Sequence, residues 1–147
     1  MLARARGFIP IVEDFDADLM DEIRGIADGA DCALEEIVAL NSRTELMFKD
    51  GGSNFRHGEC TAMAAMPEAT ADGHMLIGQN WDWVTRIQGN CVVLDIEQAG
   101  KPRVLTFTEA GFVGKFGMNE AGLGLCANLL VGAESRPGVQ FHLFCRG

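Results

Sequence analysis

The sequence predicts an α+β fold in which two N-terminal helices precede an antiparallel β-sheet. Most of the acidic excess behind the net charge of −9 lies before residue 60. In that half, apolar residues repeat at the spacing of a helix. After residue 60 they fall into short runs bounded by turn residues, which is typical of strands. A chain of 147 residues is expected to form one domain.

The first predicted helix begins after Asp16, a suitable N-cap, and ends near Gly29. Its apolar face would consist of Leu19, Ile23, Ile26 and Ala27. The second helix is expected to begin after Asp31 as its cap and to run to about 41–43, with Leu34, Ile37 and Val38 on one face. Residues 49–54 are rich in turn formers and separate these helices from the strands.

The remaining sequence predicts strands at 60–66, 74–80, 91–97, 103–109, 112–117 and 123–130. Short connections rich in Gly, Pro, Asn and Asp link several of them, so neighbouring strands are expected to be antiparallel. Residues 135–147 are expected to form a loop and the first turn of a helix. A sheet with one apolar face needs a covering layer, and two acidic helices hardly supply it. We therefore interpret the sequence as a fragment.

Composition excludes several classes of function. An acidic chain without a basic stripe is not expected to bind nucleic acid, and no apolar run is long enough for a membrane helix. The five cysteines (32, 60, 91, 126 and 145) suggest free thiols in a reducing, cytoplasmic compartment. No cysteine or histidine pattern predicts a metal site, and no Gly-rich loop between a strand and a helix predicts a nucleotide, so no cofactor is expected.

Cys60 is the candidate nucleophile. It opens a predicted strand, and the return strand leads into Gly78-Gln-Asn-Trp-Asp-Trp83, which brings Asp82 back toward it. A thiol attacks efficiently only as the thiolate, so a proton acceptor is needed.

Four stretches resemble the isopenicillin-N / penicillin acyltransferase-like family of autoproteolytic N-terminal-nucleophile (Ntn) hydrolases and, more distantly, the bile-salt hydrolases. They are Asn41-Ser-Arg-Thr-Glu45, the segment from Cys60 to Trp83, Thr106-Phe-Thr-Glu-Ala-Gly111, and Gly114 to Asn128 with its Gly-Met-Asn-Glu-Ala-Gly-Leu core. The resemblance implies an αββα sandwich. Residues 1–59 would be a helical propeptide-like segment, and residues 60–147 the N-terminal part of the catalytic domain, without its C-terminal half.

The resemblance also implies the site. The chain would cut itself between Glu59 and Cys60, and the freed α-amine would serve as the base for the thiol. Asp82 would hold the new ammonium, and Asn128 would donate to the oxyanion. Two departures stand out: Gln79 replaces the arginine of bile-salt hydrolases, and Glu59 replaces the glycine of many relatives.

The implied reaction is acyl transfer from an amide or acyl thioester through acyl-Cys60 to water or an amine. Gln79, Asn80, Trp81 and Trp83 are candidate substrate contacts, although packing in the core is the simpler role for at least one tryptophan. Arg43 and Glu45 are interpreted as a structural ion pair or helix-end contact. The expected partners are a small-molecule substrate and, through self-association or a heterodimer of cleavage products, the chain itself.

Two alternatives remain open from the sequence. The chain could be a non-catalytic Ntn-like remnant that acts as a binding unit. It could also be a Cys–His hydrolase that does not cleave itself, with His57 or His74 as its base.

Overall fold

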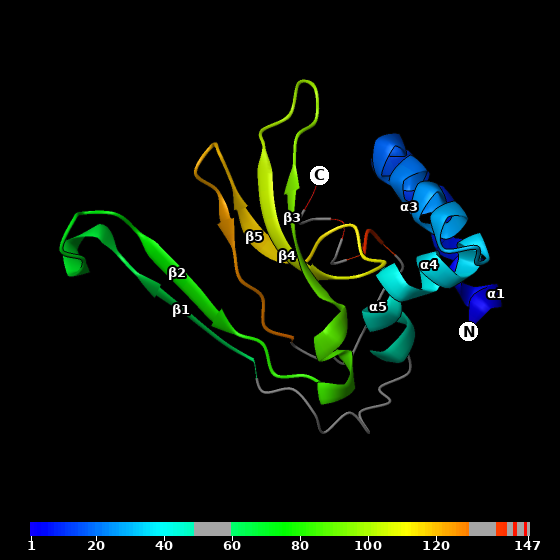
Figure 1. Cartoon of the computed structure of the whole chain (residues 1–147), viewed down its shortest axis with the longest axis horizontal. Coiled ribbons are helices and arrows are strands. Elements are labelled where there is room, and N and C mark those ends of the chain that lie inside the picture. Colours follow the sequence, from blue (N-terminus) through cyan, green and yellow to red (C-terminus); the bar gives the residue numbers. More distant parts are fainter. Residues whose placement is uncertain (49–59, 130–137, 141–142, 144–145, 147) are drawn as a thin grey trace.

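The structure, a computed structural model, describes residues 1–48, 60–129, 138–140, 143 and 146 (Figure 1). The predicted α+β class is confirmed. The α-helices are α1 Leu2–Ala5, α2 Ile9–Phe15, α3 Ala17–Gly29, α4 Leu34–Asn41 and α5 Arg43–Phe48. The strands are β1 Thr61–Ala65, β2 Leu76–Asn80, β3 Cys91–Ile96, β4 Val104–Glu109, β5 Phe116–Asn119 and β6 Gly124–Leu125. Short 3-10 turns lie at Arg6–Phe8, Pro67–Ala69 and Thr85–Asn90.

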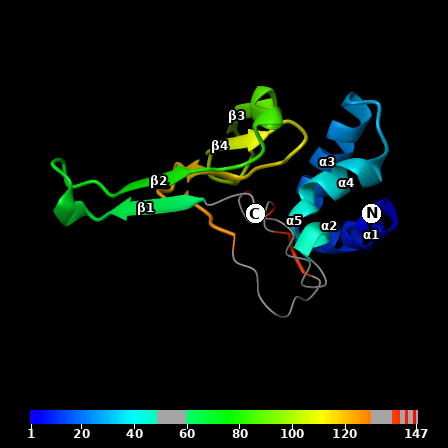
Figure 2. The ribbon, with the colours of Figure 1, turned by 90° about the horizontal axis from the view of Figure 1, so that it is seen from below.

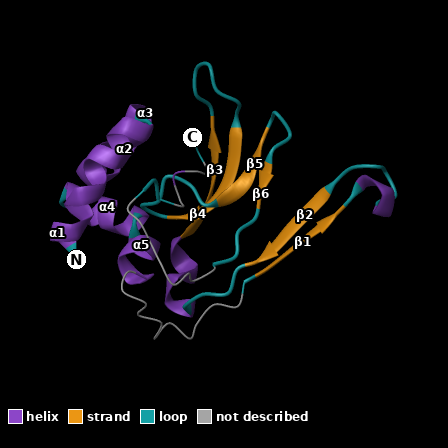
Figure 3. Cartoon of the chain, turned by 180° about the vertical axis from the view of Figure 1, so that it is seen from behind, coloured by secondary structure: helices purple, strands orange, loops and turns teal. Residues whose placement is uncertain are grey.

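The strands form two antiparallel sheets instead of the one expected. Strands β3-β4-β5-β6 follow one another in sequence order, and β1 pairs with β2 alone. The helices gather on one side of the four-stranded sheet (Figures 1 and 3), and the β1–β2 hairpin extends away from them on the other side (Figure 2). The molecule is therefore built as a helical unit, a central sheet and a projecting hairpin.

The main apolar core lies among the helices. Its fully buried members include Val12, Leu19, Met20, Ile23 and Val38, and the later chain adds Val113 and Leu143. Burial of such side chains stabilises a fold by about 1.5–3 kcal/mol each. Because the core is centred on the helices, the sheet is attached to it mainly through the loop that carries Val113.

The start of α3 agrees with the sequence prediction, whereas the start of α4 does not. Asp16 caps α3, since its carboxylate accepts from the backbone N–H of Asp18 at 2.9 Å. The cap of α4 is Ala33, not Asp31, and the Glu36 carboxylate accepts from the Ala33 N–H at 2.9 Å. Asp31 instead adopts a left-handed conformation with φ 51°. The helices α1 and α2 were not predicted at all.

Two predicted strands are displaced or short. Residues 112–115 form a loop, and β5 begins only at Phe116. The reason is a sharp turn at Gly111, which has φ +92° and where a Cβ would come within 2.6 Å of Leu40. The strand predicted at 123–130 is reduced to β6, and residue 130 lies outside the described residues, as does most of the segment predicted at 135–147.

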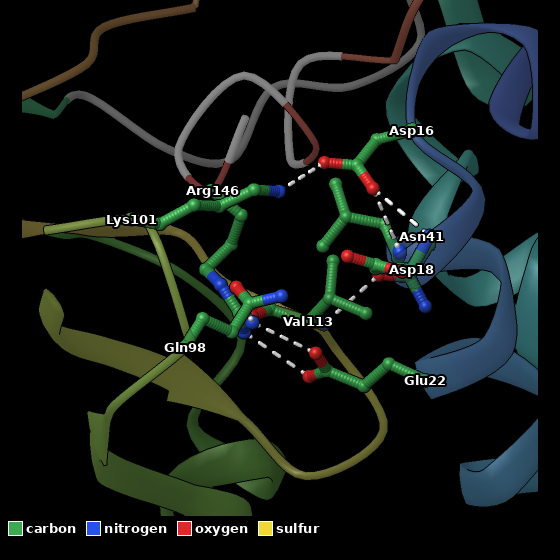
Figure 4. Close-up of polar contacts among 9 residues, drawn as sticks. Asp16, Asp18, Glu22, Asn41, Gln98, Lys101, Val113 and Arg146 are labelled. Atoms are coloured by element: carbon green, nitrogen blue, oxygen red, sulfur yellow. Dashed lines mark hydrogen bonds and ion pairs between the residues drawn. The ribbon is translucent and has the colours of Figure 1, made fainter. Parts of the chain in front are cut away.

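Polar contacts fasten the helices to the later chain (Figure 4). Lys101 donates to Asp16 at 2.5 Å. The buried guanidinium of Arg146 binds Glu22 at 2.8 Å and donates to the Val113 carbonyl at 2.7 Å. These contacts join residues far apart in sequence, so the helical unit and the sheet form one folded body.

Several large apolar side chains are exposed on the strands. Val93, Leu105 and Met118 lie on the four-stranded sheet, and Met63 and Leu76 lie on the hairpin. Leu105 and Met118 are cross-strand partners, so they share one face. Exposed apolar surface of this kind marks a place where another layer or molecule can pack.

We expect Asp16→Ala to lower the free energy of unfolding by about 0.5–2 kcal/mol, because it removes the N-cap of α3 and the partner of Lys101. Urea unfolding followed by circular dichroism would measure the change. Asp14→Ala, in the exposed part of α2, is the matched control and should have little effect. Equal losses in both variants would contradict the capping role.

Candidate active site

The register of the hairpin sets the position of Cys60. Thr61 pairs with Asn80, so Cys60 stands just before β1, at the end of the hairpin where the chain leaves β2 toward Trp81 and Asp82. Cys60 is a half-buried free thiol, whereas Asp82 is exposed. The backbone thus brings the predicted nucleophile and its carboxylate to the same end of the hairpin.

Asn128 is brought to this end by Gln79. The Gln79 side-chain amide donates to the Ala127 carbonyl at 2.6 Å, and its oxygen accepts from the Ala127 N–H at 2.7 Å. Gln79 lies opposite Ala62 in β1, so Asn128 follows a residue fixed to the start of the hairpin. Asn80 and Asn128 are both exposed. In this structure the Gln79 amide holds the backbone next to Asn128.

A buried group of three charges lies beside this end of the hairpin. We call Arg43, Glu109 and Lys115 the charge cluster. Arg43 donates to both carboxylate oxygens of Glu109, at 2.7 and 2.5 Å, and Lys115 donates to the same carboxylate at 2.6 Å. The side chains of Glu109 and Lys115 are only 5% and 4% exposed. Arg43, interpreted from the sequence as part of a structural ion pair or helix-end contact, pairs here with Glu109 of β4.

Aromatic rings enclose the charge cluster. Lys115 Nζ lies 3.4 Å from the centroid of Trp81, and the Arg43 guanidinium lies between Trp83, at 4.9 Å, and Phe112, at 4.5 Å. Such cation–π contacts gain strength when water is excluded. The two tryptophans, predicted as possible substrate contacts, therefore pack against the cations in this structure.

Trp81 also packs on the sheet. It makes edge contacts with Phe107 and Phe116, whose centroids lie 5.9 and 6.3 Å away, and these two residues are cross-strand partners in β4 and β5. The ring thus connects the hairpin end that carries Cys60 to the central sheet.

Burial and neighbouring charges shift the pKa values of the cluster. Burial lowers the pKa of Lys115 to about 8, although Glu109 and the Cys60 thiolate both act to raise it. Burial alone would raise the pKa of Glu109, but the hydrogen bonds from Arg43 and Lys115 hold that pKa below its usual value. Among these influences on the pKa of Lys115, burial is the largest and that of Cys60 is the smallest.

The loop between β4 and β5 positions Lys115. Asn41, buried at the end of α4, donates to the Gly111 carbonyl at 2.9 Å and accepts from the Val113 N–H at 3.1 Å. At the other end of the loop, the Lys115 N–H donates to the Thr106 hydroxyl at 3.2 Å. The loop is therefore held on both sides of the turn.

Lys115 and Glu109 have no role predicted from the sequence. Both lie inside stretches used for the family resemblance, and two charged residues in an otherwise apolar and Gly-rich segment were the available signal. Of the alternative bases, His74 lies beyond the far end of the hairpin, where Ala65 pairs with Leu76. Glu59 and His57 lie outside the described residues.

Other features of the described chain lie away from Cys60. A pocket of about 270 Å³ lies over the opposite end of the sheet, lined among others by Val104, Asn119 and Arg146. Among the described residues, no three His, Cys, Asp or Glu side chains are arranged to hold a metal ion. No helix of the described part is long and apolar enough to cross a bilayer.

We expect Glu109→Gln to lower the free energy of unfolding by about 3–5 kcal/mol, because two buried cations lose their shared carboxylate. The pKa of Glu109 is lowered in the folded state, so its contribution is complete above the ordinary value of 4.5 and disappears as the pH falls through the folded value. The difference in the free energy of unfolding between wild type and variant should therefore become smaller in acid. Urea unfolding at pH 7 and at several pH values below 4.5 measures it.

Glu97→Gln makes the same chemical change at a side chain that is 75% exposed and should barely alter stability. If the difference in the free energy of unfolding between wild type and Glu109→Gln stays constant, or grows, as the pH falls, ionised Glu109 does not stabilise the charge cluster.

Comparison with known proteins gives the site its context. No family model matches the chain. The chain is 40% identical over 127 residues to the 40 kDa form of acyl-coenzyme A:6-aminopenicillanic-acid acyltransferase of Emericella nidulans. The match covers 86% of this chain and 34% of that protein, so the chain spans about a third of the length of its relative. The resemblance to the penicillin acyltransferase-like family is thereby confirmed over most of the chain.

Proposed function

We propose that the chain carries the nucleophile of an autoproteolytic acyltransferase, with Cys60 as the group that accepts the acyl chain. The similarity to a named acyltransferase carries this proposal. The site supports it, because Cys60 stands at the hairpin end where Asp82 and Asn128 are also found.

In the proposed maturation step, the Cys60 thiolate attacks the carbonyl carbon of Glu59. The peptide C–N bond breaks, a thioester forms, and the Cys60 nitrogen takes up a proton to become a free amine. Water then hydrolyses the thioester, which leaves the Glu59 carboxylate and the Cys60 thiol. A free α-amine has a pKa near ~7.7–8.0, so it can act as a base close to neutral pH.

In turnover, the freed α-amine accepts the thiol proton and Cys60 attacks an acyl donor. The leaving thiol or amine departs with that proton, and acyl-Cys60 then passes its acyl group to an amine or to water. Asp82 holds the ammonium of Cys60, and Asn128 donates to the oxyanion. The name of the relative favours an acyl thioester as donor and an amine as acceptor for this chain.

We expect cleavage before Cys60 when the chain is produced at the length of its relative. Mass spectrometry should find one product that ends at Glu59 and another that begins at Cys60. Cys60→Ala should remain whole, and Cys91→Ala, which changes another half-buried free cysteine, should cleave as wild type does. Cleavage of Cys60→Ala at the wild-type rate would refute the mechanism.

Asp82→Asn and Asn128→Ala should fail in different ways. Asp82→Asn removes the charge that holds the ammonium, so it should impair maturation and turnover and alter the pH profile. Asn128→Ala should lower the chemical rate by about 10²–10³, the usual cost of a lost oxyanion donor, and should leave the pH profile in place. Precleaved enzyme and acyl-transfer kinetics across pH separate the two effects. A pH shift in Asn128→Ala alone would reverse the assignments.

A further inference from the structure

The proposed function does not assign a base to the first step. Before cleavage, the nitrogen of Cys60 belongs to a peptide bond and cannot accept the thiol proton. The first attack therefore depends on groups that favour the thiolate while the chain is intact. His74 lies beyond the far end of the hairpin and cannot serve.

We propose that Lys115 is a positioning residue that favours the thiolate of Cys60 while the chain is uncut. The proposal rests on Cys60 being the nucleophile. Lys115 acts through its positive charge, and the thiol proton passes to solvent. The thiolate then attacks as described above, so no further reactant is needed.

Geometry supports this role. The Lys115 ammonium is buried against the Trp81 ring at 3.4 Å, and Trp81 directly follows the strand residue that pairs with Thr61. Asn41 and Thr106 fix the loop that bears Lys115. A flexible lysine is thereby restricted to the hairpin end that carries Cys60.

The electrostatics of the cluster point the same way. When ionised, the charge cluster has two positive groups and one negative group, all largely shielded from water. The Cys60 thiolate raises the pKa of Lys115, which means that the ammonium and the thiolate attract each other. A positive charge held near a thiol favours the thiolate over the neutral form.

The charged groups acting on Lys115 come from three parts of the chain. Glu109 lies on β4 and raises its pKa, Arg43 lies on α5 and lowers it, and Cys60 precedes β1 and raises it. Burial dominates and brings the pKa of Lys115 to about 8. Lys115 is therefore mostly charged at neutral pH, and it loses this charge at a pH that is easily reached in an experiment.

Alkylation of the uncut 147-residue chain by iodoacetamide tests the proposal. Peptide mass spectrometry measures the rate at Cys60 separately from the other cysteines, between pH 6 and pH 10. We expect Lys115→Met to lower the alkylation rate at Cys60 about tenfold near neutral pH, because the thiolate loses a neighbouring positive charge. Lys115→Arg should retain the wild-type rate near neutral pH, because it keeps the charge.

Lys101→Met is the matched control. It also removes a lysine paired with a carboxylate, but that carboxylate is Asp16 at the helical unit, so the Cys60 profile should not move. Circular dichroism would establish that each variant is folded. A folded Lys115→Met with the wild-type profile, or an equal shift in Lys101→Met, would overturn the proposal.

If Lys115→Met does not fold, the alkylation profile of Lys115→Arg tests the proposal instead. Arginine does not lose its proton in this range, so the variant should follow a single-step profile, whereas wild type should show a second inflection as Lys115 titrates. Identical profiles for wild type and Lys115→Arg would overturn the proposal.

Cleavage at Cys60 with an unchanged Lys115→Met profile would refute only the role of Lys115. A shifted profile with no cleavage or acyl transfer would refute only the proposed function.

Discussion

The hydrogen bonds of the Asn41 side chain are the contacts on which the rest of the site depends. Asn41 is the last residue of α4, and its amide donates to the Ile37 carbonyl at 3.0 Å. The same side chain also donates to the Gly111 carbonyl and accepts from the Val113 N–H. A buried amide satisfied in this way fixes both elements, because losing any partner would leave a polar group without water. Asn41 thereby fixes the turn at Gly111 against the end of α4, and with it one side of the loop that carries Lys115.

The charge cluster lies next to this loop, and it includes Lys115 from the loop itself. Burying three ionised groups is costly, and such clusters are weak contributors to stability even when well paired. What the arrangement does provide is a fixed electric field: the bidentate contact of Arg43 holds Glu109, Glu109 holds Lys115, and Lys115 faces the hairpin end that carries Cys60. A preorganised charge needs little rearrangement when a neighbouring group ionises.

Local patterns made much of the fold predictable. The cap at Asp16, the apolar face of α3 and the hairpin pairing of β3 with β4 follow from helix chemistry, periodicity and turn residues, all of which lie within a few residues of one another. The same reasoning placed Cys60 and Asp82 at one end of a hairpin. It misplaced β5, because apolar residues 112–113 look like strand residues but fill the helical core and its border.

The contact between Arg43 and Glu109 was beyond such reasoning. It joins residues 66 positions apart, and Glu45, two residues from Arg43, offered a nearer carboxylate. The bonds of Asn41 span 70 and 72 positions and have no local signature either. The sequence shows that a charged side chain stands in an apolar segment, but only the packed structure shows which distant residue it contacts.

The contacts between the helices and the later chain would become contacts between two chains if the chain is cut before Cys60. Arg43 with Glu109, Asn41 with Gly111, Asp16 with Lys101 and Glu22 with Arg146 all join a residue before the cut to a residue after it. Cleavage would turn these contacts within one chain into the interface of a two-chain complex. Its integrity would then depend on concentration, as that of any dimer does. The part of the chain before Cys60, which includes all the α-helices from α1 to α5, would become a dissociable subunit.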